Sequence, residues 1–290
     1  MKIKHLSKKI NGVEVLSDIN FEIKTGSIVG IIGRNGAGKT TLLRTMVGIL
    51  EPSKGDVCIS DKSIFTYPEL KQDIIFVPDS SEALKAYSTR EIITLYESIY
   101  PRFDIDYFHE LMNRFSLPYV RKIGSYSKGM KALFSLVIAF STKAKYILLD
   151  EPTDGLDVIV KNRVLKVLVE EVAVNEVSVI ISSHRLDELE FMANEIVMIK
   201  EGLVDSHYEL DAMKSQFIKA QIVFKKQLPE VVQNKVIIIN QTGRVYTVLF
   251  NKDEEIESLI HEHAPILYEE LSLSLEDIFI AKLGGDEFVS

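Results

Sequence analysis

A glycine-rich segment, GRNGAGKTTLL from Gly33 to Leu43, constrains this 290-residue chain more than any other part of it. It matches the pattern G-x-x-x-x-G-K-S/T at all four fixed positions, which are Gly33, Gly38, Lys39 and Thr40. Glycines let the backbone turn tightly, so that successive N–H groups and the start of the next helix can point at one anion. The alternative is a glycine-rich connection with an incidental lysine. An apolar run before the segment and an amphipathic run after it favour a strand, a phosphate-binding loop and a helix.

Lys39 and Thr40 give this loop its chemistry. In a phosphate loop the lysine reaches the outer phosphates of a nucleotide, and the hydroxyl oxygen of the next residue is a ligand for Mg²⁺. The amphipathic run predicts a helix from about Lys39 to Val47, whose positive end adds to the attraction for an anion. We therefore expect a nucleotide and Mg²⁺ to bind here.

Composition limits the partners of the chain. The net charge of -8 argues against nucleic acid as the main partner, because nucleic-acid-binding surfaces carry a basic surplus. No apolar run approaches the roughly 20 residues that span a bilayer. The opening MKIKHLSKKI is not followed by the apolar segment of a signal peptide. The single Cys58 fits a reducing compartment and is interpreted as a small apolar strand residue. We expect a cytoplasmic chain that does not itself cross a membrane.

Hydrophobic periodicity predicts the core of the fold. The alternating segments MKIKHL and INFEIKTG predict antiparallel strands, and the apolar runs SIVGII, QDIIFVPD, YILLD, VSVIISS and EIVMIK predict buried strands. From about Ser80 to Ala144 the pattern is helical, and Ser88 and Glu91 are typical of a capping box. Another helical segment separates YILLD from VSVIISS. Apolar strands alternating with helices predict a largely parallel sheet that is covered on both faces.

The pattern changes past about Asp205. The segments AQIVFKK, KVIIIN and RVYTVLF predict further strands, and helical segments are expected near Asp253–His263 and Leu275–Lys282. The predicted fold class is α/β: a P-loop NTPase core with a mixed sheet, an antiparallel β subdomain and a helical insert, plus a small C-terminal α+β appendage. We expect a first domain over residues 1–210, with the helical subdomain at about 80–144, and a second domain over 211–290.

Acidic residues and a histidine follow two of the buried strands. Asp150 ends YILLD, where its carboxylate can orient a Mg²⁺ shell, and Glu151 comes directly after it. Two adjacent carboxylates at a strand end alternate in direction, so Glu151 is free to polarise the water that attacks a γ-phosphate. The alternative is an acidic junction between a strand and a turn. His184 follows VSVIISS, and its place beside the other strand ends favours a functional role over a structural one.

The segment GSYSKGMKALFSLVIAF adds a second anion-ready helix start. It places Ser127 and Gly129 immediately before a predicted helix.

Together, and in this order, these motifs resemble the ATP-binding-cassette (ABC) family of transporter ATPases over about Met1–Leu210. The resemblance implies that Gly33–Thr41 is the Walker A loop and that Tyr126–Met130, YSKGM, takes the place of the signature motif. It implies a Walker B aspartate at Asp150, a catalytic base at Glu151 and a switch histidine at His184. The implied contacts with ATP are made by Asn35, Gly36, Ala37, Gly38, Lys39, Thr40, Thr41, Ile10, Ser127, Gly129 and, in the D-loop DGLD, Asp157; those with Mg²⁺ by Thr40, Asp79 and Asp150.

The family's mechanism also implies a partner cassette. Two subunits pack head to tail, and the signature motif of one closes over the nucleotide in the Walker A loop of the other. One chain then supplies only half of each working site, and the second cassette is an identical or a different chain.

The sequence departs from the family pattern at three places. In the signature motif, usually L-S-G-G-Q, Lys128 and Met130 replace a glycine and the glutamine. Asp79 stands where a glutamine is usual; it keeps an oxygen ligand for Mg²⁺ but loses the amide donor and gains a charge. Ile10 stands where an aromatic ring usually stacks on adenine, and it offers apolar contact only. For Asp79 the alternative is a solvated turn residue after Pro78.

The C-terminal segment LSLEDIFIAKLGG is similar to the tails of ABC-2-type exporter ATPases. That branch handles drugs, antibiotics, peptides or polysaccharides, and includes systems that export amphipathic antimicrobial or phenol-soluble modulin peptides. The resemblance implies a chain peripheral to the inner face of the cell membrane, where it hydrolyses ATP to power an integral-membrane permease. Two other functions are considered. One is a soluble cassette ATPase that acts on ribosomes or DNA, which the acidic balance and the single cassette disfavour. The other is a nucleotide-binding regulator with weak hydrolysis.

Overall fold

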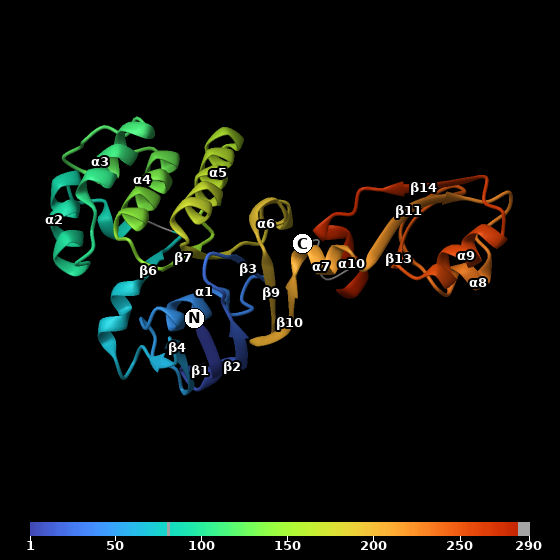
Figure 1. Ribbon diagram of the computed structural model, residues 1–290, viewed down its shortest axis with the longest axis horizontal. Coiled ribbons are helices and arrows are strands. Elements are labelled where there is room, and N and C mark those ends of the chain that lie inside the picture. Colours follow the sequence, from blue (N-terminus) through green and yellow to red (C-terminus); the bar gives the residue numbers. More distant parts are fainter. Residues whose placement is uncertain (80–81, 284–290) are drawn as a thin grey trace. The chain divides into compact units, whose positions relative to one another are not determined.

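The computed structural model describes residues 1–79 and 82–283 (Figure 1). The chain divides into two compact units. The first consists of Met1–His184 and Met192–His207, and the second of Arg185–Phe191 and Tyr208–Ser290. Over the described residues, no helix has the length and the apolar character that are needed to span a bilayer.

A six-stranded sheet forms the centre of the first unit, in the order β10-β9-β3-β8-β7-β6. β3 pairs in parallel with β8 and β9, and β7 pairs in parallel with β6 and β8. Every residue of β3, β7 and β8 is buried, as the continuous apolar runs in the sequence predict. The strands are β3 (Ile28–Ile32), β6 (Ile74–Val77), β7 (Tyr146–Asp150), β8 (Ser178–Ser182), β9 (Glu195–Lys200) and β10 (Leu203–Glu209).

A smaller antiparallel sheet has the order β2-β1-β4-β5, with β1 (Lys2–Ile10), β2 (Val13–Glu22), β4 (Lys54–Ile59) and β5 (Lys62–Ser63). Its buried side chains share one apolar core with helix α1 (Lys39–Met46) and the central sheet. Leu6 and Leu16 lie in that core with Leu42, Met46 and Val29, and all five are fully buried. The loop between β3 and α1 is therefore fixed from both sheets.

The remaining helices of the first unit include α2 (Thr89–Ile99), α3 (Ile105–Arg114), α4 (Lys128–Ser141) and α5 (Val158–Asn175). In Figure 1, α2, α3 and α4 gather above the strands, opposite β1, β2 and β4. The predicted capping box at the start of α2 is present, with Ser88 and Glu91 each accepting the other's backbone N–H. An aromatic cluster of Phe108, Phe134 and Tyr126 joins α3 to the start of α4. Short 3₁₀ helices η1 (Pro68–Asp73), η2 (Glu82–Leu84) and η3 (Ile123–Ser125) connect these elements.

The second unit contains an antiparallel sheet in the order β12-β13-β11-β14. Its chain order is β11 (Phe217–Val223), α8 (Glu230–Gln233), β12 (Ile237–Thr242), β13 (Val245–Asn251), α9 (Glu254–Glu262) and β14 (Leu267–Leu271). This β-α-β-β-α-β order with β11 and β13 at the centre is ferredoxin-like. The unit also contains α7 (Leu210–Lys214), α10 (Leu275–Leu283) and all of α6 (Leu186–Met192) except Met192.

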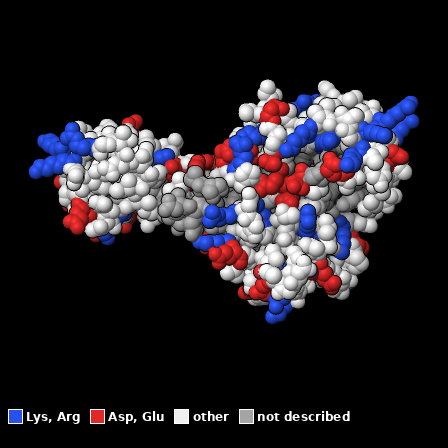
Figure 2. Space-filling view, turned by 180° about the vertical axis from the view of Figure 1, so that it is seen from behind, with Lys and Arg blue, Asp and Glu red and all other residues white. Residues whose placement is uncertain are grey.

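Charge is shared unequally between the units. The first unit has 25 Lys and Arg and 25 Asp and Glu, whereas the second has 9 and 17, so the second unit accounts for the net charge of -8. On the face drawn in Figure 2, positive and negative side chains are mixed over the larger first unit.

Candidate functional site

The phosphate loop, Gly33–Thr41, begins after β3 and runs into α1. Gly36 and Gly38 have φ angles of 82° and 107°, in the region that favours glycine. A Cβ built on Gly38 would lie 2.9 Å from the Leu16 side chain of β2, and one built on Gly33 would overlap the Ile199 carbonyl oxygen. Glycine is therefore required for conformation at Gly36 and Gly38 and for space at Gly33 and Gly38. The structure supports the predicted strand, loop and helix unit.

Lys39 is buried although it carries a charge, with an exposed fraction of 7%. Its Nζ donates to the Gly33 carbonyl oxygen at 2.7 Å and to the Arg34 carbonyl oxygen at 3.4 Å, and lies 3.8 Å from Glu151 Oε1. The ammonium group is thus held over its own loop by two backbone oxygens and one carboxylate. A buried cation at this position is suited to an anionic ligand in the loop.

Asp150, the last residue of β7, is the centre of an oxygen cluster. Its Oδ1 accepts from Thr40 Oγ1 at 3.2 Å and from Ser182 Oγ at 2.6 Å, and only 3% of the residue is exposed. The structure therefore brings together Thr40 and Asp150, two of the three predicted Mg²⁺ ligands. Hydroxyl and carboxylate oxygens are the ligand type that Mg²⁺ prefers, so these residues fit that ion.

Ser182 belongs to this cluster but was not among the predicted site residues. It ends β8 next to β7, where Asp150 and Ser182 are register partners. In the sequence, Ser182 was marked only by its position at a strand end, two residues before His184. Serine is common at strand ends, so this position alone did not indicate a site residue. The pairing of β7 with β8 makes it part of the site.

Glu151 and His184 meet beside Lys39. His184 Nδ1 lies 2.9 Å from Glu151 Oε2, and the His184 backbone N–H donates to the same oxygen at 3.4 Å. Glu151 lies outside β7, with a left-handed φ of 46° that is uncommon for a residue with a side chain. The Glu151 backbone N–H donates to the carbonyl oxygen of Ser182 at 3.2 Å and to Ser182 Oγ at 3.1 Å. The side chains of Glu151 and Asp150 therefore point in different directions because Glu151 lies in a turn, and not because they alternate along a strand.

The signature segment Tyr126–Met130 forms the start of α4. Ser127 is the N-cap of this helix and accepts from the Met130 backbone N–H at 3.2 Å. Gly129 is packed so closely on Val160 of α5 that a Cβ there would lie 2.9 Å from a Val160 methyl group. Asp157 caps α5 by accepting from the N–H groups of Ile159 and Val160. Ser127 and Asp157 thus make these hydrogen bonds to the starts of their own helices, α4 and α5.

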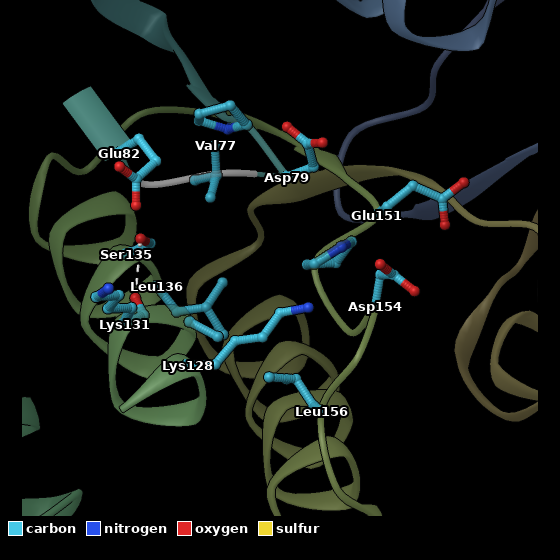
Figure 3. A pocket seen from close by; sticks show the side chains of 13 residues that line it. Val77, Asp79, Glu82, Lys128, Lys131, Ser135, Leu136, Glu151, Asp154 and Leu156 are labelled. Carbon is cyan, nitrogen blue, oxygen red and sulfur yellow. Dashed lines mark hydrogen bonds between the residues drawn. The ribbon is translucent and has the colours of Figure 1, made fainter. Parts of the chain in front are cut away.

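A pocket of about 470 Å³ lies between α4, the loop after β6 and the turn after β7 (Figure 3). Asp79 and Glu151 both line it, so the structure places Asp79 in the same pocket as the predicted base. Within the described part of the chain, Asp79 has no hydrogen bond with Thr40 or Asp150. The other lining residues are Val77, Pro78, Glu82, Lys128, Lys131, Ala132, Ser135, Leu136, Pro152, Asp154 and Leu156.

Ile10 ends β1, where it pairs with Val13 at the turn into β2. Both side chains are exposed. Val15, further along β2, contacts the position of Gly38, so this hairpin continues into the wall of the phosphate loop. The hairpin thus has an exposed apolar surface at Ile10 and Val13, and its strand β2 continues to the phosphate loop.

Comparisons with known proteins identify the family of the chain. Residues 16–154 match the family model described as ABC transporter. The chain is 38% identical over 287 residues to the ABC transporter ATP-binding protein YtrB of Bacillus subtilis (strain 168), covering 98% of each chain. It is 28% identical over 306 residues to the bacitracin transport ATP-binding protein BcrA of Bacillus licheniformis, covering 98% of this chain and 97% of that protein.

A solved structure has a similar fold. It is described as the ATP binding subunit of an ABC transporter and is 26% identical, with a TM-score of 0.64 over 74% of this chain and 92% of that one. The predicted P-loop NTPase fold and the predicted family are therefore confirmed. The chain belongs to the family of ABC transporter ATP-binding proteins, which are ATPases.

Proposed function

We propose that this chain hydrolyses ATP to drive a separate integral-membrane permease that exports a peptide, a drug or a similar substrate. The bacitracin transport protein BcrA, similar over nearly its whole length, supports the exporter assignment. We further propose a cytoplasmic location at the inner face of the membrane and an accessory role for the second unit. The observation that carries the ATPase assignment is the convergence of Lys39, Asp150, Glu151 and His184 at one edge of the central sheet.

ATP binding follows from the phosphate loop. The backbone N–H groups of residues 35–41 and the N-terminus of α1 cradle the phosphates, and Lys39 exchanges its carbonyl partners for phosphate oxygens. Ile10 supplies apolar contact for the adenine. Thr40 and Asp150 would hold Mg²⁺ through oxygen atoms, and Asp79 would supply a further oxygen to its shell. When bound, Mg²⁺ neutralises charge on the phosphate oxygens.

Hydrolysis requires a proton acceptor for the attacking water. Glu151 takes that proton as general base, and the hydrogen bond from its backbone N–H to Ser182 Oγ holds the turn that carries its carboxylate. His184 holds the carboxylate through Nδ1 and the backbone N–H, so it orients the base toward the γ-phosphate. Ser127, Gly129 and Asp157 complete the site of a second cassette subunit, identical or different, in an ATP-bound sandwich.

Two substitutions test the assignment by separating binding from turnover. Glu151→Gln removes the proton acceptor and keeps the shape, so it should slow hydrolysis by about 10²–10⁴-fold and preserve ATP affinity. Lys39→Ala should weaken nucleotide binding itself, because a buried cation is lost. Hydrolysis by the purified chain with its permease, and binding of a fluorescent ATP analogue, measure the two effects.

Two outcomes would contradict the proposal. Near-normal turnover in Glu151→Gln would remove that residue from the role of base. Hydrolysis that is the same with and without co-purifying membrane protein would favour a regulator or a soluble ATPase over a transport subunit.

A further inference from the structure

Lys128 places a positive charge in the signature segment. Its side chain is exposed, and the ammonium end lies next to Gly155 in the turn after β7. It lines the pocket between α4 and the turn after β7, together with Glu151, Pro152 and Asp154. Figure 3 shows its ammonium group directed toward the side of the pocket that carries Asp154. Among the described residues, no salt bridge involves Lys128, and the neighbour of its ammonium group is the backbone of Gly155.

The contact beneath this ammonium group is Gly155. A Cβ built on Gly155 would overlap Lys128 Nζ, and the next nearest atoms are Lys128 Cε and Cδ at 3.4 and 3.8 Å. Gly155 also has a φ of 61°, which favours glycine. The D-loop, Asp154–Asp157, therefore passes directly under the end of the lysine side chain, and the glycine leaves room for it.

A second glycine makes the reciprocal contact. Gly129, next to Lys128, is packed against Val160 in the first turn of α5. A Cβ built on Gly129 would lie 2.9 and 3.1 Å from the two methyl groups of Val160. Asp157 caps that same turn through the Val160 N–H. The start of α4 and the D-loop are thus joined at two points, Gly129 on Val160 and Lys128 on Gly155.

We propose that Lys128 is a positioning residue: its side chain holds the D-loop against the signature segment, so that both present one preformed surface to a second ATP-loaded cassette. The proposal rests on the proposed function. The ammonium group also adds a positive charge to a pocket that the carboxylates of Asp79, Glu82, Glu151 and Asp154 line. A preformed surface lowers the entropy cost of ordering these segments when two chains associate. Loss of Lys128 should therefore weaken dimer formation and leave ATP binding by one chain unchanged.

The test measures ATP-dependent dimer formation by light scattering in the Glu151→Gln background, where bound ATP persists. Lys128→Met keeps most of the stem and removes the charge, and we expect it to raise the dimer dissociation constant roughly ten-fold. The affinity of a single chain for a fluorescent ATP analogue should stay unchanged. Lys128→Arg should restore dimer formation, and Lys131→Met, which removes the other cation of the pocket, is the matched control and should have little effect.

A double-mutant cycle identifies the contact with the D-loop. Gly155→Ala should weaken the dimer more in the parent chain than in the Lys128→Ala background, because only the parent has a side chain that the new methyl group displaces. Gly243→Ala is the control, since Gly243 has a φ of 63° and no atom within 4 Å of a built Cβ.

Three results would overturn the inference: a dimer unaffected by Lys128→Met, an equal loss in Lys131→Met, or additive effects of the Lys128 and Gly155 substitutions. Additive effects with a weakened dimer would place the ammonium group on the partner's nucleotide instead of the D-loop. If Glu151→Gln itself does not bind ATP or does not dimerise with ATP, the proposed function fails, and that outcome is separate from these three.

Discussion

At the scale of single residues, the site depends on side chains that serve two neighbours at once. Ser182 Oγ donates to Asp150 and accepts from the Glu151 N–H, so one hydroxyl group fixes the Asp150 carboxylate and the backbone of Glu151. Glu151 adopts a left-handed conformation that costs on the order of 1 kcal/mol or more. Such strain at a proposed catalytic position is sustained by the buried strands on either side.

Asp79 gives a prediction at this scale. We expect Asp79→Gln to keep most activity, because it retains an oxygen ligand, and Asp79→Ala to lose stimulation by the permease while sparing ATP affinity. The reason is its place in the pocket with Glu151, on the loop that leads from β6 to the helical insert. Permease-stimulated hydrolysis of the reconstituted complex measures both variants. Full stimulation of Asp79→Ala would make Asp79 a solvated loop residue.

At the scale of elements, helix ends fix the segments that carry the site. Ser127 and Asp157 satisfy backbone N–H groups at the starts of α4 and α5, and they are also residues expected to meet a second cassette. The start of α10 uses the same device in the second unit: Ser274 Oγ accepts from the Asp277 N–H, and Asp277 Oδ2 accepts from the Ser274 N–H.

Asp277 gives a prediction for the stability of the second unit. Burial alone would raise its pKa, but hydrogen bonds from Lys219 and Ser274 outweigh burial and hold the pKa of Asp277 below its ordinary 3.8. Asp277→Asn should therefore lower the free energy of unfolding by about 1–3 kcal/mol at neutral pH. Denaturant unfolding of the full chain measures it, with exposed Glu269→Gln as the control.

The sign of the pH dependence follows from the lowered pKa of Asp277. The stabilisation is fully present above the unfolded-state pKa, about 4, and it is lost as the pH falls through the lower folded-state value. The difference between the parent chain and Asp277→Asn should thus shrink at acidic pH. A difference that stays the same even below the folded-state pKa, or no difference at neutral pH, would show that the charge of Asp277 and its contact with Lys219 contribute little.

At the scale of the whole molecule, charge governs how two copies approach. Each chain carries a net charge of -8, and the surplus belongs to the second unit. Two such chains repel each other at long range, whereas contacts through nucleotide are short-ranged. Because the Debye length falls from about 30 Å at 0.01 M salt to about 10 Å at 0.1 M, added salt screens the repulsion first.

We therefore expect the parent chain to be mainly monomeric without nucleotide, and the Glu151→Gln dimer formed with ATP to tighten as salt rises to about 0.1 M. Light scattering over a salt series measures the dimer fraction. Neutralising exposed Glu254 and Glu255 on α9 as glutamines should reduce the salt effect. A dimer that weakens steadily with salt would mean that attraction between opposite charges dominates. If ATP does not change the molar mass of Glu151→Gln measured by light scattering, the partner cassette is more consistent with a different chain.

Local patterns in the sequence were sufficient for much of this description. The phosphate loop, the buried strands around it and the capping box of Ser88 and Glu91 were all predictable, because each depends on residues a few positions apart. The order Lys39, Asp150, Glu151, His184 also indicated the family, which the similarity to known ATP-binding proteins confirms.

The tertiary structure decided what depends on pairing between distant segments. Ser182 joins the site only because β8 lies beside β7, and Lys128 reaches Gly155 only because α4 packs against α5. β14 was not predicted, because its sequence LYEEL is polar and partly exposed, and it becomes a strand by pairing with β11. The sequence by itself determined the chemistry of the loop and strand ends. Long-range packing, which no local pattern encodes, determined which side chains meet there.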